Sequence, residues 1–484
     1  MRAEMDKYFM GLDVGTQGVR CMVVDARGET VAAQSVAFAR MNSASAPGAY
    51  EQLPADWQAA SEQAIRACTT QLPNAARVAS ISIDGTSGTI VPLDARFCPL
   101  MPALMYNDPR AKVEAARVHA EMGAHEQKLG LTFGASFSLP RILWIKAHRP
   151  QIYEKTRVFA HQADYVVGLL CGEYCVSDYS NALKTGYDLI ERRWPDAIAR
   201  MGLDLGKFPR VLGPGEPIAP VTRAAAERLG LSEKTMVVGG STDGYASALA
   251  AGAVSAGQWA SIIGTTFVLK GVTDELVIDP SGAAYSHLLP SGEWMLGGAS
   301  NLGGRCLNAC AQGRAFAEMD RAAEPLVPTG ARCYPLSGRG ERFPFVDPDA
   351  EAFYRGDILS GKLYPALMEG VALGERLAFA RMEKLGAPVG QTIWTAGGAC
   401  RSDLWLRIRA SVLNRQLVVP GSIDAAMGSA LVAASGAFGS LALAAGAMLR
   451  REKTVDPVDG WVRAYDEVYK AFEEDCRKNY RTAE

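Results

Sequence analysis

Two short segments, half a chain apart, share one pattern, and this repetition most constrains the fold. In the first, the apolar stretch 8–13 enters a glycine-rich turn at residues 14–18, and another apolar stretch follows. In the second, residues 260–263 lead into Gly264-Thr265-Thr266 and a further apolar stretch. Two copies of strand, Gly-Thr turn and strand predict a duplicated α/β unit with a cleft between the copies.

The segments around these turns read as further strands and helices. We expect a strand at residues 30–35, a helix with apolar periodicity at 54–67, and buried strands at 78–83 and 391–396. Such alternation is typical of an α/β fold.

A chain of 484 residues is too long for one ordinary core, so two domains are expected. We place them at residues 1–248 and 249–484, because the small-residue stretch 246–253 follows the buried segment that ends near Gly240.

Charge and cysteine usage exclude several classes of protein. The formal net charge is −2, with no basic patch for nucleic acid. The ten cysteines form no CxxC motif, and no histidine lies at zinc-ligand spacing from the pairs Cys171/Cys175 and Cys306/Cys310. We interpret them as buried thiols. Unpaired cysteines and the lack of a secretory signal predict a cytoplasmic protein.

Residues 425–449 carry no charge and have the length of a membrane span. Glycine, alanine and serine dominate the segment, and Gly436, Gly439 and Gly446 interrupt a single long helix. Two packed, buried helices fit this composition better, so no membrane partner is expected.

Several common catalytic motifs are missing from the sequence. There is no GxxxxGK[ST] phosphate loop, no protein-kinase HRD or DFG, no GxGxxG after a strand and no GxSxG. A phosphate site, if present, is therefore of another kind.

The two Gly-Thr turns and two carboxylates can carry phosphoryl-transfer chemistry. Backbone N–H groups in glycine-rich turns bind phosphate oxygens, which suits residues 15–18 and 264–266. Asp13 ends a strand at the first turn and could hold Mg²⁺. Asp243 follows the buried segment 237–240 and could accept a hydroxyl proton. Taken singly, each turn could be a structural hairpin and Asp243 a helix N-cap.

Together these motifs resemble those of the FGGY carbohydrate kinases. The residues that carry the resemblance are Asp13-Val14-Gly15-Thr16-Gln17-Gly18-Val19-Arg20, Gly240-Ser241-Thr242-Asp243, Gly264-Thr265-Thr266 and Gly397-Gly398-Ala399-Cys400-Arg401-Ser402-Asp403-Leu404-Trp405. They occur in family order over residues 8–470. The resemblance implies two duplicated actin-like ATPase domains of the sugar kinase/Hsp70/actin, ribonuclease H-like class, with an interdomain cleft.

The resemblance also implies a role for particular residues. Asp243 is the expected catalytic base, Asp13 the expected Mg²⁺ ligand, and Ser87 joins both around a small sugar or polyol. The residues expected to bind ATP are Gly15, Thr16, Gln17, Gly264, Thr265, Gly397, Gly398, Ala399 and Asp403.

Within the family, the chain looks most similar to the D-ribulose kinases of plants and cyanobacteria. The shared segments include 83–87, 105–108, 161–164 and 177–184. Xylulokinases carry Met-His where this chain has Thr86-Ser87, which argues against D-xylulose. The family signature near residues 140–148 expects lysine where Arg141 stands, so contacts of that helix should differ.

Other functions stay open at this point. D-xylulose or another polyol could be the acceptor, and a catalytically inactive sugar- and nucleotide-binding regulator is an alternative of another class. A chaperone ATPase is a remote third, since no peptide-binding β domain follows the charged helix expected at residues 461–480. A homodimer is possible, although no interface can be read from the residues.

Overall fold

The computed structural model describes residues 6–41, 48–359 and 361–481. The chain divides into two compact units. The first comprises Met1–Ala250, His287–Gly292 and Asp424–Leu449, and the second comprises Ala251–Ser286, Glu293–Ile423 and Arg450–Glu484. The division proposed at residues 248 and 249 lies beside the first change of unit. Residues 424–449 return to the first unit, which a single division at residues 248 and 249 does not predict.

The first unit is built on a mixed sheet with strand order β11-β12-β5-β1-β2-β3, and β13 also pairs with β5. Its strands are β1 (Tyr8–Val14), β2 (Gly18–Asp25), β3 (Thr30–Ala37), β5 (Val78–Gly85), β11 (Pro217–Pro220), β12 (Met236–Val238) and β13 (Ser241–Thr242). The smaller strands are β4 (Glu51–Gln52), β6 (Ile90–Leu93), β7 (Ala103–Leu104), β8 (Val158–His161), β9 (Val176–Asp178) and β10 (Arg210–Leu212).

The second unit repeats this arrangement with strand order β16-β17-β15-β14-β20-β21-β22. These strands are β14 (Trp259–Ile263), β15 (Phe267–Thr273), β16 (Tyr285–Leu288), β17 (Trp294–Ser300), β20 (Thr392–Ala396), β21 (Gln416–Pro420) and β22 (Arg451–Val455), with a separate pair β18 (Arg332–Tyr334) and β19 (Phe353–Arg355).

Strand directions match between the two sheets. From β3 to β11, and again from β17 to β22, neighbours pair antiparallel, antiparallel, parallel, parallel and antiparallel. The predicted duplication of an α/β unit is therefore confirmed. Both Gly-Thr turns join the same pair of strands in their copy, β1 to β2 and β14 to β15.

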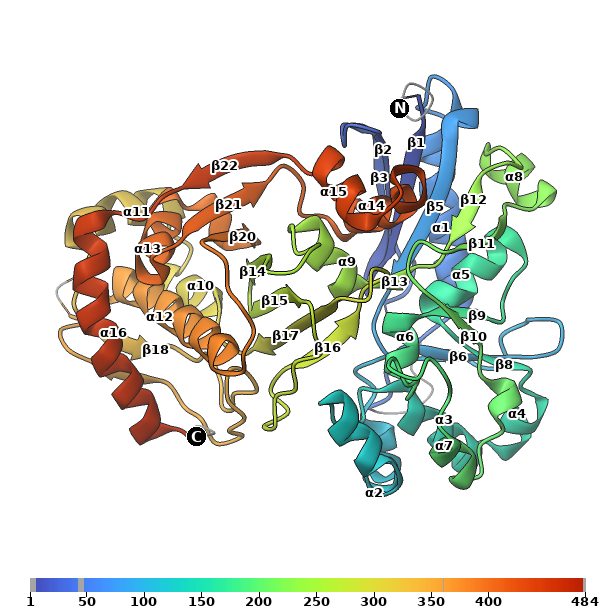
Figure 1. Cartoon of the computed structure of the whole chain (residues 1–484), viewed down its shortest axis with the longest axis horizontal. Helices are drawn as coiled ribbons and strands as arrows, with labels where there is room; N and C mark the ends of the chain where they lie inside the picture. Colours follow the sequence, from blue (N-terminus) through green and yellow to red (C-terminus); the bar gives the residue numbers. More distant parts are fainter. Residues whose placement is uncertain (1–5, 42–47, 360, 482–484) are drawn as a thin grey trace. The chain divides into compact units, whose positions relative to one another are not determined.

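Helices surround each sheet (Figure 1). Those of the first unit are α1 (Pro54–Thr69), α2 (Lys112–Leu129), α3 (Ser138–His148), α4 (Pro150–Lys155), α5 (Gln162–Cys171), α6 (Tyr179–Leu183), α7 (Asp196–Arg200), α8 (Arg223–Leu229), α9 (Asp243–Ala250), α14 (Ala425–Phe438) and α15 (Leu441–Met448). Those of the second are α10 (Arg305–Ala311), α11 (Phe316–Ala323), α12 (Leu363–Lys384), α13 (Asp403–Leu413) and α16 (Asp459–Asn479).

Strand β1 is buried along its whole length because helices cover both faces of the sheet. Met10 and Leu12 belong to the core cluster that contains Trp57 of α1. The alternate residues Gly11 and Asp13 point to the opposite face, where α14 packs on β1 and β5. A Cβ atom at Gly11 would lie 1.8 Å from a backbone oxygen of α14, so only glycine allows this helix to come so close.

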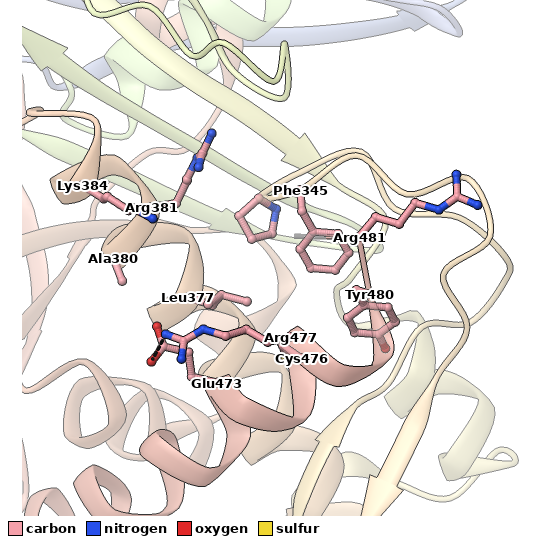
Figure 2. A pocket seen from close by; sticks show the side chains of 11 residues that line it. Phe345, Leu377, Ala380, Arg381, Lys384, Glu473, Cys476, Arg477, Tyr480 and Arg481 are labelled. Atoms are coloured by element: carbon pink, nitrogen blue, oxygen red, sulfur yellow. Dashed lines mark ion pairs between the residues drawn. The ribbon is translucent and has the colours of Figure 1, made fainter. Parts of the chain in front are cut away.

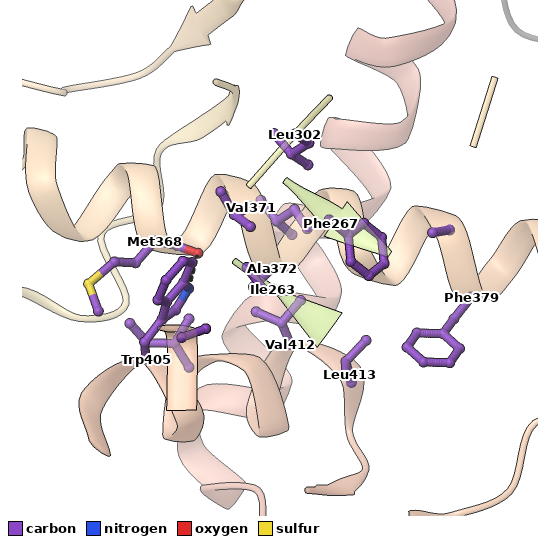
Figure 3. Close-up of a cluster of buried hydrophobic side chains, with 14 of the residues drawn as sticks. Ile263, Phe267, Leu302, Met368, Val371, Ala372, Phe379, Trp405, Val412 and Leu413 are labelled. Atoms are coloured by element: carbon purple, nitrogen blue, oxygen red, sulfur yellow. Dashed lines mark hydrogen bonds between the residues drawn. The ribbon is translucent and has the colours of Figure 1, made fainter. Parts of the chain in front are cut away.

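The second unit has its own core between its sheet and the helices α12 and α13. Figure 3 shows Ile263 and Phe267 of the sheet together with Val371 of α12 and Val412 of α13. Trp405 anchors α13 to α12, since its indole N–H donates to the Met368 carbonyl at 3.0 Å. This packing places the start of α13 beside the Gly-Thr turn after β14.

The segment 425–449 forms two helices, as predicted. α14 and α15 meet at an angle of 115°, and within the described residues no single helix is long and apolar enough to span a membrane. Residues 425–434 of α14 are buried against the first sheet. The cysteines are free thiols, and the described part of the chain holds no group of three or more His, Cys, Asp or Glu side chains that could hold a metal ion.

Candidate active site

Three carboxylates gather at the carboxyl ends of adjacent strands in the first unit. Asp13 of β1 and Asp84 of β5 are paired residues of a parallel ladder. Strand β13 pairs with Asp84 and Gly85 on the other side of β5, and Asp243 follows it as the first residue of α9. The carboxyl ends of neighbouring parallel strands form one edge of a sheet, where α/β proteins commonly bind ligands. The charge of Asp13 acts on Asp243 directly.

Burial shapes the acidity of the inner two carboxyls. Asp84 is fully buried and accepts a hydrogen bond of 2.6 Å from the Ser429 hydroxyl of α14. Burial and the neighbouring charge of Asp13 raise the pKa of Asp84 well above its usual value. Burial also raises the pKa of Asp13, while its hydrogen bond with Asp84 lowers it. Arg20 lies 3.8 Å from the Asp13 carboxylate.

Asp243 combines a raised pKa with backbone donors. It is half-buried, and its carboxylate accepts from the amides of Gly244, at 2.7 Å, and Ser87. Loss of solvation, followed by the charge of Asp13, raises the pKa of Asp243 to about 6, while the charge of Lys184 opposes the rise. A carboxylate with a pKa close to the working pH is suited to general base catalysis.

The side chains next to Asp243 offer groups for a polar ligand. The Ser87 hydroxyl is buried and has no hydrogen-bond partner within the described residues. Lys184 is buried, and its ammonium lies 3.9 Å from the centre of the Phe137 ring. An unpaired buried hydroxyl is costly unless a ligand or water completes it. The predicted site residue Ser87 therefore lies beside Asp243 with a free hydroxyl.

The loop of the first hairpin lines a cavity of about 350 Å³. Its walls include Asp13, Gly15, Thr16, Gln17 and Arg20. The turn is closed by a bond of 3.0 Å from the Gly15 amide to the Gly18 carbonyl. The side-chain amide of Gln52 donates to the Thr16 carbonyl at 2.8 Å. The loop is thus held in place while its open side faces the cavity.

In the second unit, a cavity of about 410 Å³ brings together two of the predicted ATP-binding segments. Gly264 and Thr265 lie on one side, and Gly398 and Ala399 on another. The amide of Gly304 at the start of α10 donates to the Gly264 carbonyl at 2.8 Å, which fixes the turn. Aliphatic, aromatic and polar side chains complete the cavity: Leu307, Asn308, Phe316, Asp320, Tyr364 and Trp405.

Two of the ATP-binding residues predicted in the second unit do not line that cavity. Gly397 has φ +92°, and a Cβ there would lie 2.4 Å from the Ile263 carbonyl, so it shapes the turn through its backbone. Asp403 is the first residue of α13. Its side chain is 76% exposed and forms an ion pair with Lys453 of β22. Its contact with a nucleotide stays a prediction.

Another cavity of the second unit, of about 560 Å³, lies elsewhere. Figure 2 shows its lining side chains, most of which come from α12 and α16. Its arginines are already neutralised, because Arg381 pairs with Asp279, Arg477 with Glu473 and Arg481 with Asp349. None of the predicted site residues lines it.

The sequence analysis did not name several residues of these sites. Asp84 has the same sequence signal as Asp13, an acid at the end of a buried strand, but it enters the predictions only as part of the shared segment 83–87. Lys184 likewise enters only as part of the shared segment 177–184. The walls Phe316 and Tyr364 had no recognisable signal, because both come from segments remote in sequence from the Gly-Thr turn.

Family models decide the relationship of this chain to known proteins. The model of the N-terminal domain of the FGGY family of carbohydrate kinases matches residues 8–250, and that of the C-terminal domain matches residues 259–437. The chain belongs to the FGGY family of carbohydrate kinases. The resemblance inferred from the motifs is confirmed, and the protein is an ATP-dependent sugar kinase with the family fold.

The names of this chain's FGGY relatives refer to different substrates. This chain is 27% identical to a xylulose kinase of Bacillus subtilis, over 96% of each chain. It is 26% identical to a gluconokinase of the same organism, over 87% of this chain and 85% of the relative. The crystal structure of a xylulose kinase from Rhodospirillum rubrum superposes with a TM-score of 0.87 at 28% identity, covering 98% of this chain and 99% of that one.

Proposed function

We propose that this FGGY kinase transfers the γ-phosphate of ATP to a terminal hydroxyl of a ketopentose, with D-ribulose as the first candidate. The observation that carries the phosphoryl transfer is the place of Asp243 at the sheet edge next to Asp13 and Asp84, with the unpaired Ser87 hydroxyl beside it. D-ribulose follows from the resemblance of the segments around Thr86-Ser87. A pKa of about 6 leaves Asp243 mostly ionised near neutral pH and able to take a proton from an attacking hydroxyl.

The acceptor sugar would lie against Asp243, Ser87 and Asp13. The free Ser87 hydroxyl can both donate to and accept from a sugar hydroxyl. Asp13 and Asp243 accept hydrogen bonds, and Lys184 supplies a donor nearby. Alternating donors and acceptors suit a polyol or ketose.

Each unit carries its own candidate phosphate-binding turn. In the first unit, the loop at Gly15, Thr16 and Gln17 would offer backbone donors to a phosphate. In the second unit, the cavity at Gly264 and Thr265 would bind ATP. Gly398 and Ala399 would lie along the adenosine. Positioning and electrostatic stabilisation supply most of the rate in such reactions.

Magnesium fits the residues present, because Asp13 offers a buried carboxylate at the edge of the phosphate loop, and hard cations prefer oxygen ligands. Mg²⁺ supplies charge neutralisation of the phosphates when bound. Asp13 would hold it, while Asp84 keeps the Asp13 carboxyl in place through their hydrogen bond.

D-xylulose is the alternative acceptor, in view of the named relatives. The pair Thr86-Ser87 in place of Met-His opposes it. Ser87 lies close to Asp243. A substitution at Thr86 or Ser87 would therefore act directly on the bound acceptor.

Coupled measurement of ADP release across sugars tests the proposal. The panel contains D-ribulose, L-ribulose, D-xylulose, gluconate and glycerol. We expect D-ribulose to give the highest kcat/KM. Asp243→Asn should keep nucleotide affinity and lose turnover by about 10²–10⁴-fold. Undiminished turnover in this variant would refute the assigned base, and a higher kcat/KM for another acceptor would refute the assigned sugar.

A further inference from the structure

Arg141 of α3 is a buried cation, and among the described residues no carboxylate lies at hydrogen-bond distance from it. Only 1% of the surface of Arg141 is exposed to solvent. Burial lowers the pKa of Arg141 to about 10, so the guanidinium keeps its charge at neutral pH. The charge of Asp108 acts on Arg141, but the Asp108 carboxylate pairs with Arg110 instead. Leaving such a charge in a core is costly unless other dipoles solvate it.

Backbone carbonyls from three loops solvate this guanidinium. Nη1 donates to the carbonyls of Gly88 at 2.8 Å, Ser136 at 3.0 Å and Phe137 at 3.3 Å. Nη2 donates to the carbonyls of Tyr106 and Asp108. The planar fork of arginine can serve several fixed acceptors at once, which a lysine ammonium on a flexible stem cannot do equally well.

The first of these loops leads directly to Asp243. Gly88 has φ +89°, and a Cβ at this position would lie 2.4 Å from the Ser136 carbonyl, so the loops at 86–89 and 134–137 are in close contact. The preceding residue, Ser87, donates its amide to the Asp243 carboxylate. Arg141 therefore holds one side of a loop whose other side contacts the base.

A second path reaches Asp243 through Lys184. The amides of Ser138 and Leu139 donate to the Lys184 carbonyl, the former at 2.9 Å. The Lys184 ammonium contacts the ring of Phe137, whose carbonyl is bound to Arg141. The charge of Lys184 in turn acts on Asp243. Ser87 and Lys184, the two neighbours of Asp243, thus both depend on segments that the Arg141 guanidinium joins.

We propose that Arg141 is a positioning residue for the acceptor sugar: it joins the loops at Gly88, Tyr106 and Phe137 and so holds Ser87 and Lys184 in place around Asp243. The proposal rests on the proposed function, because it assigns these loops to the sugar and not to the nucleotide. It also gives a reason for arginine where the family signature has lysine.

Arg141→Lys is the test variant, because it keeps the charge and restores the residue of the family signature. We expect the KM and the dissociation constant for D-ribulose to rise about tenfold, since one or two charged hydrogen bonds to the loops are lost. We expect kcat to change less than about threefold and the affinity for ADP to stay unchanged. Sugar and ADP binding are measured by calorimetry, separately from turnover.

Arg409→Lys is the matched control. Arg409 is equally buried, but it lies in the second unit and pairs with Glu375. The Arg409→Lys substitution should lower the melting temperature without a selective loss of sugar affinity. An Arg141→Lys protein with wild-type sugar affinity, or with parallel losses for sugar and ADP as expected of general destabilisation, would overturn the proposal.

Hydrogen exchange of the wild-type protein tests the same point without a variant. D-ribulose should protect segments 86–89, 105–108 and 134–139 together, and ADP should not. Absence of this joint protection would overturn the proposal even if Arg141→Lys fails to fold. If the wild-type protein neither binds nor phosphorylates any acceptor sugar, the proposed function itself fails, which is a distinguishable result.

Discussion

Asp13 and Asp84 stand side by side as paired residues of adjacent parallel strands, and α14 covers both. Ser429 of this helix donates to Asp84, and Asp84 shares a hydrogen bond with Asp13. A helix late in the sequence therefore supports the carboxylate of Asp13, next to the first Gly-Thr turn.

This relationship predicts the effect of Ser429→Ala. Removing the hydroxyl leaves a buried carboxyl oxygen of Asp84 without its donor, which should cost about 1–3 kcal/mol of unfolding free energy. Urea denaturation measures it. Ser435→Ala on the same helix is the control, because the Ser435 hydroxyl bonds, among the described residues, only to the Val432 carbonyl of α14. Equal stability of the two variants would contradict the assigned contact.

The pKa of Asp243 predicts the pH dependence of catalysis. The carboxylate must be ionised to accept a proton, and its pKa is about 6 instead of the ordinary 3.8. We expect kcat/KM to fall about tenfold per unit as the pH decreases below 6. Initial rates between pH 5 and 8, with circular dichroism to verify folding, check this. A constant kcat/KM down to pH 5 would show that no group of this kind limits the reaction.

Two glycines near α14 should respond oppositely to alanine. At Gly11 the new Cβ meets a backbone oxygen at 1.8 Å, so Gly11→Ala must displace the helix and should destabilise by at least about 1–3 kcal/mol. At Gly436 the Cβ meets nothing within 4 Å, so Gly436→Ala should stabilise by about 0.4–1 kcal/mol. Thermal and urea unfolding of both variants tests this difference in sign.

Gly398 provides a selective test of the proposed nucleotide cavity. It lines the cavity, and a Cβ there meets nothing within 4 Å, so the leucine of Gly398→Leu has room to begin at the cavity wall. We expect the KM for ATP to rise at least about tenfold, because the side chain competes with the ligand for space. The melting temperature and the sugar affinity serve as controls. An unchanged KM for ATP would place the nucleotide elsewhere.

Local sequence determined much of this protein. The Gly-Thr turns, their apolar flanks and the acids at strand ends identified the duplicated fold and the family, because turn geometry and strand burial depend on neighbouring residues. The charge-free segment 425–449 could be assigned to packed helices, since glycine and alanine favour close packing over a membrane span.

Only the tertiary structure decided which distant residues meet. Ser429 and Asp84 lie 345 positions apart, and no local pattern indicates that α14 returns to the first sheet. The five carbonyls around Arg141 come from backbone that any sequence possesses, so only folding reveals that they converge. The acidity of Asp243 likewise depends on desolvation and on charges from other strands, which are properties of the assembled fold.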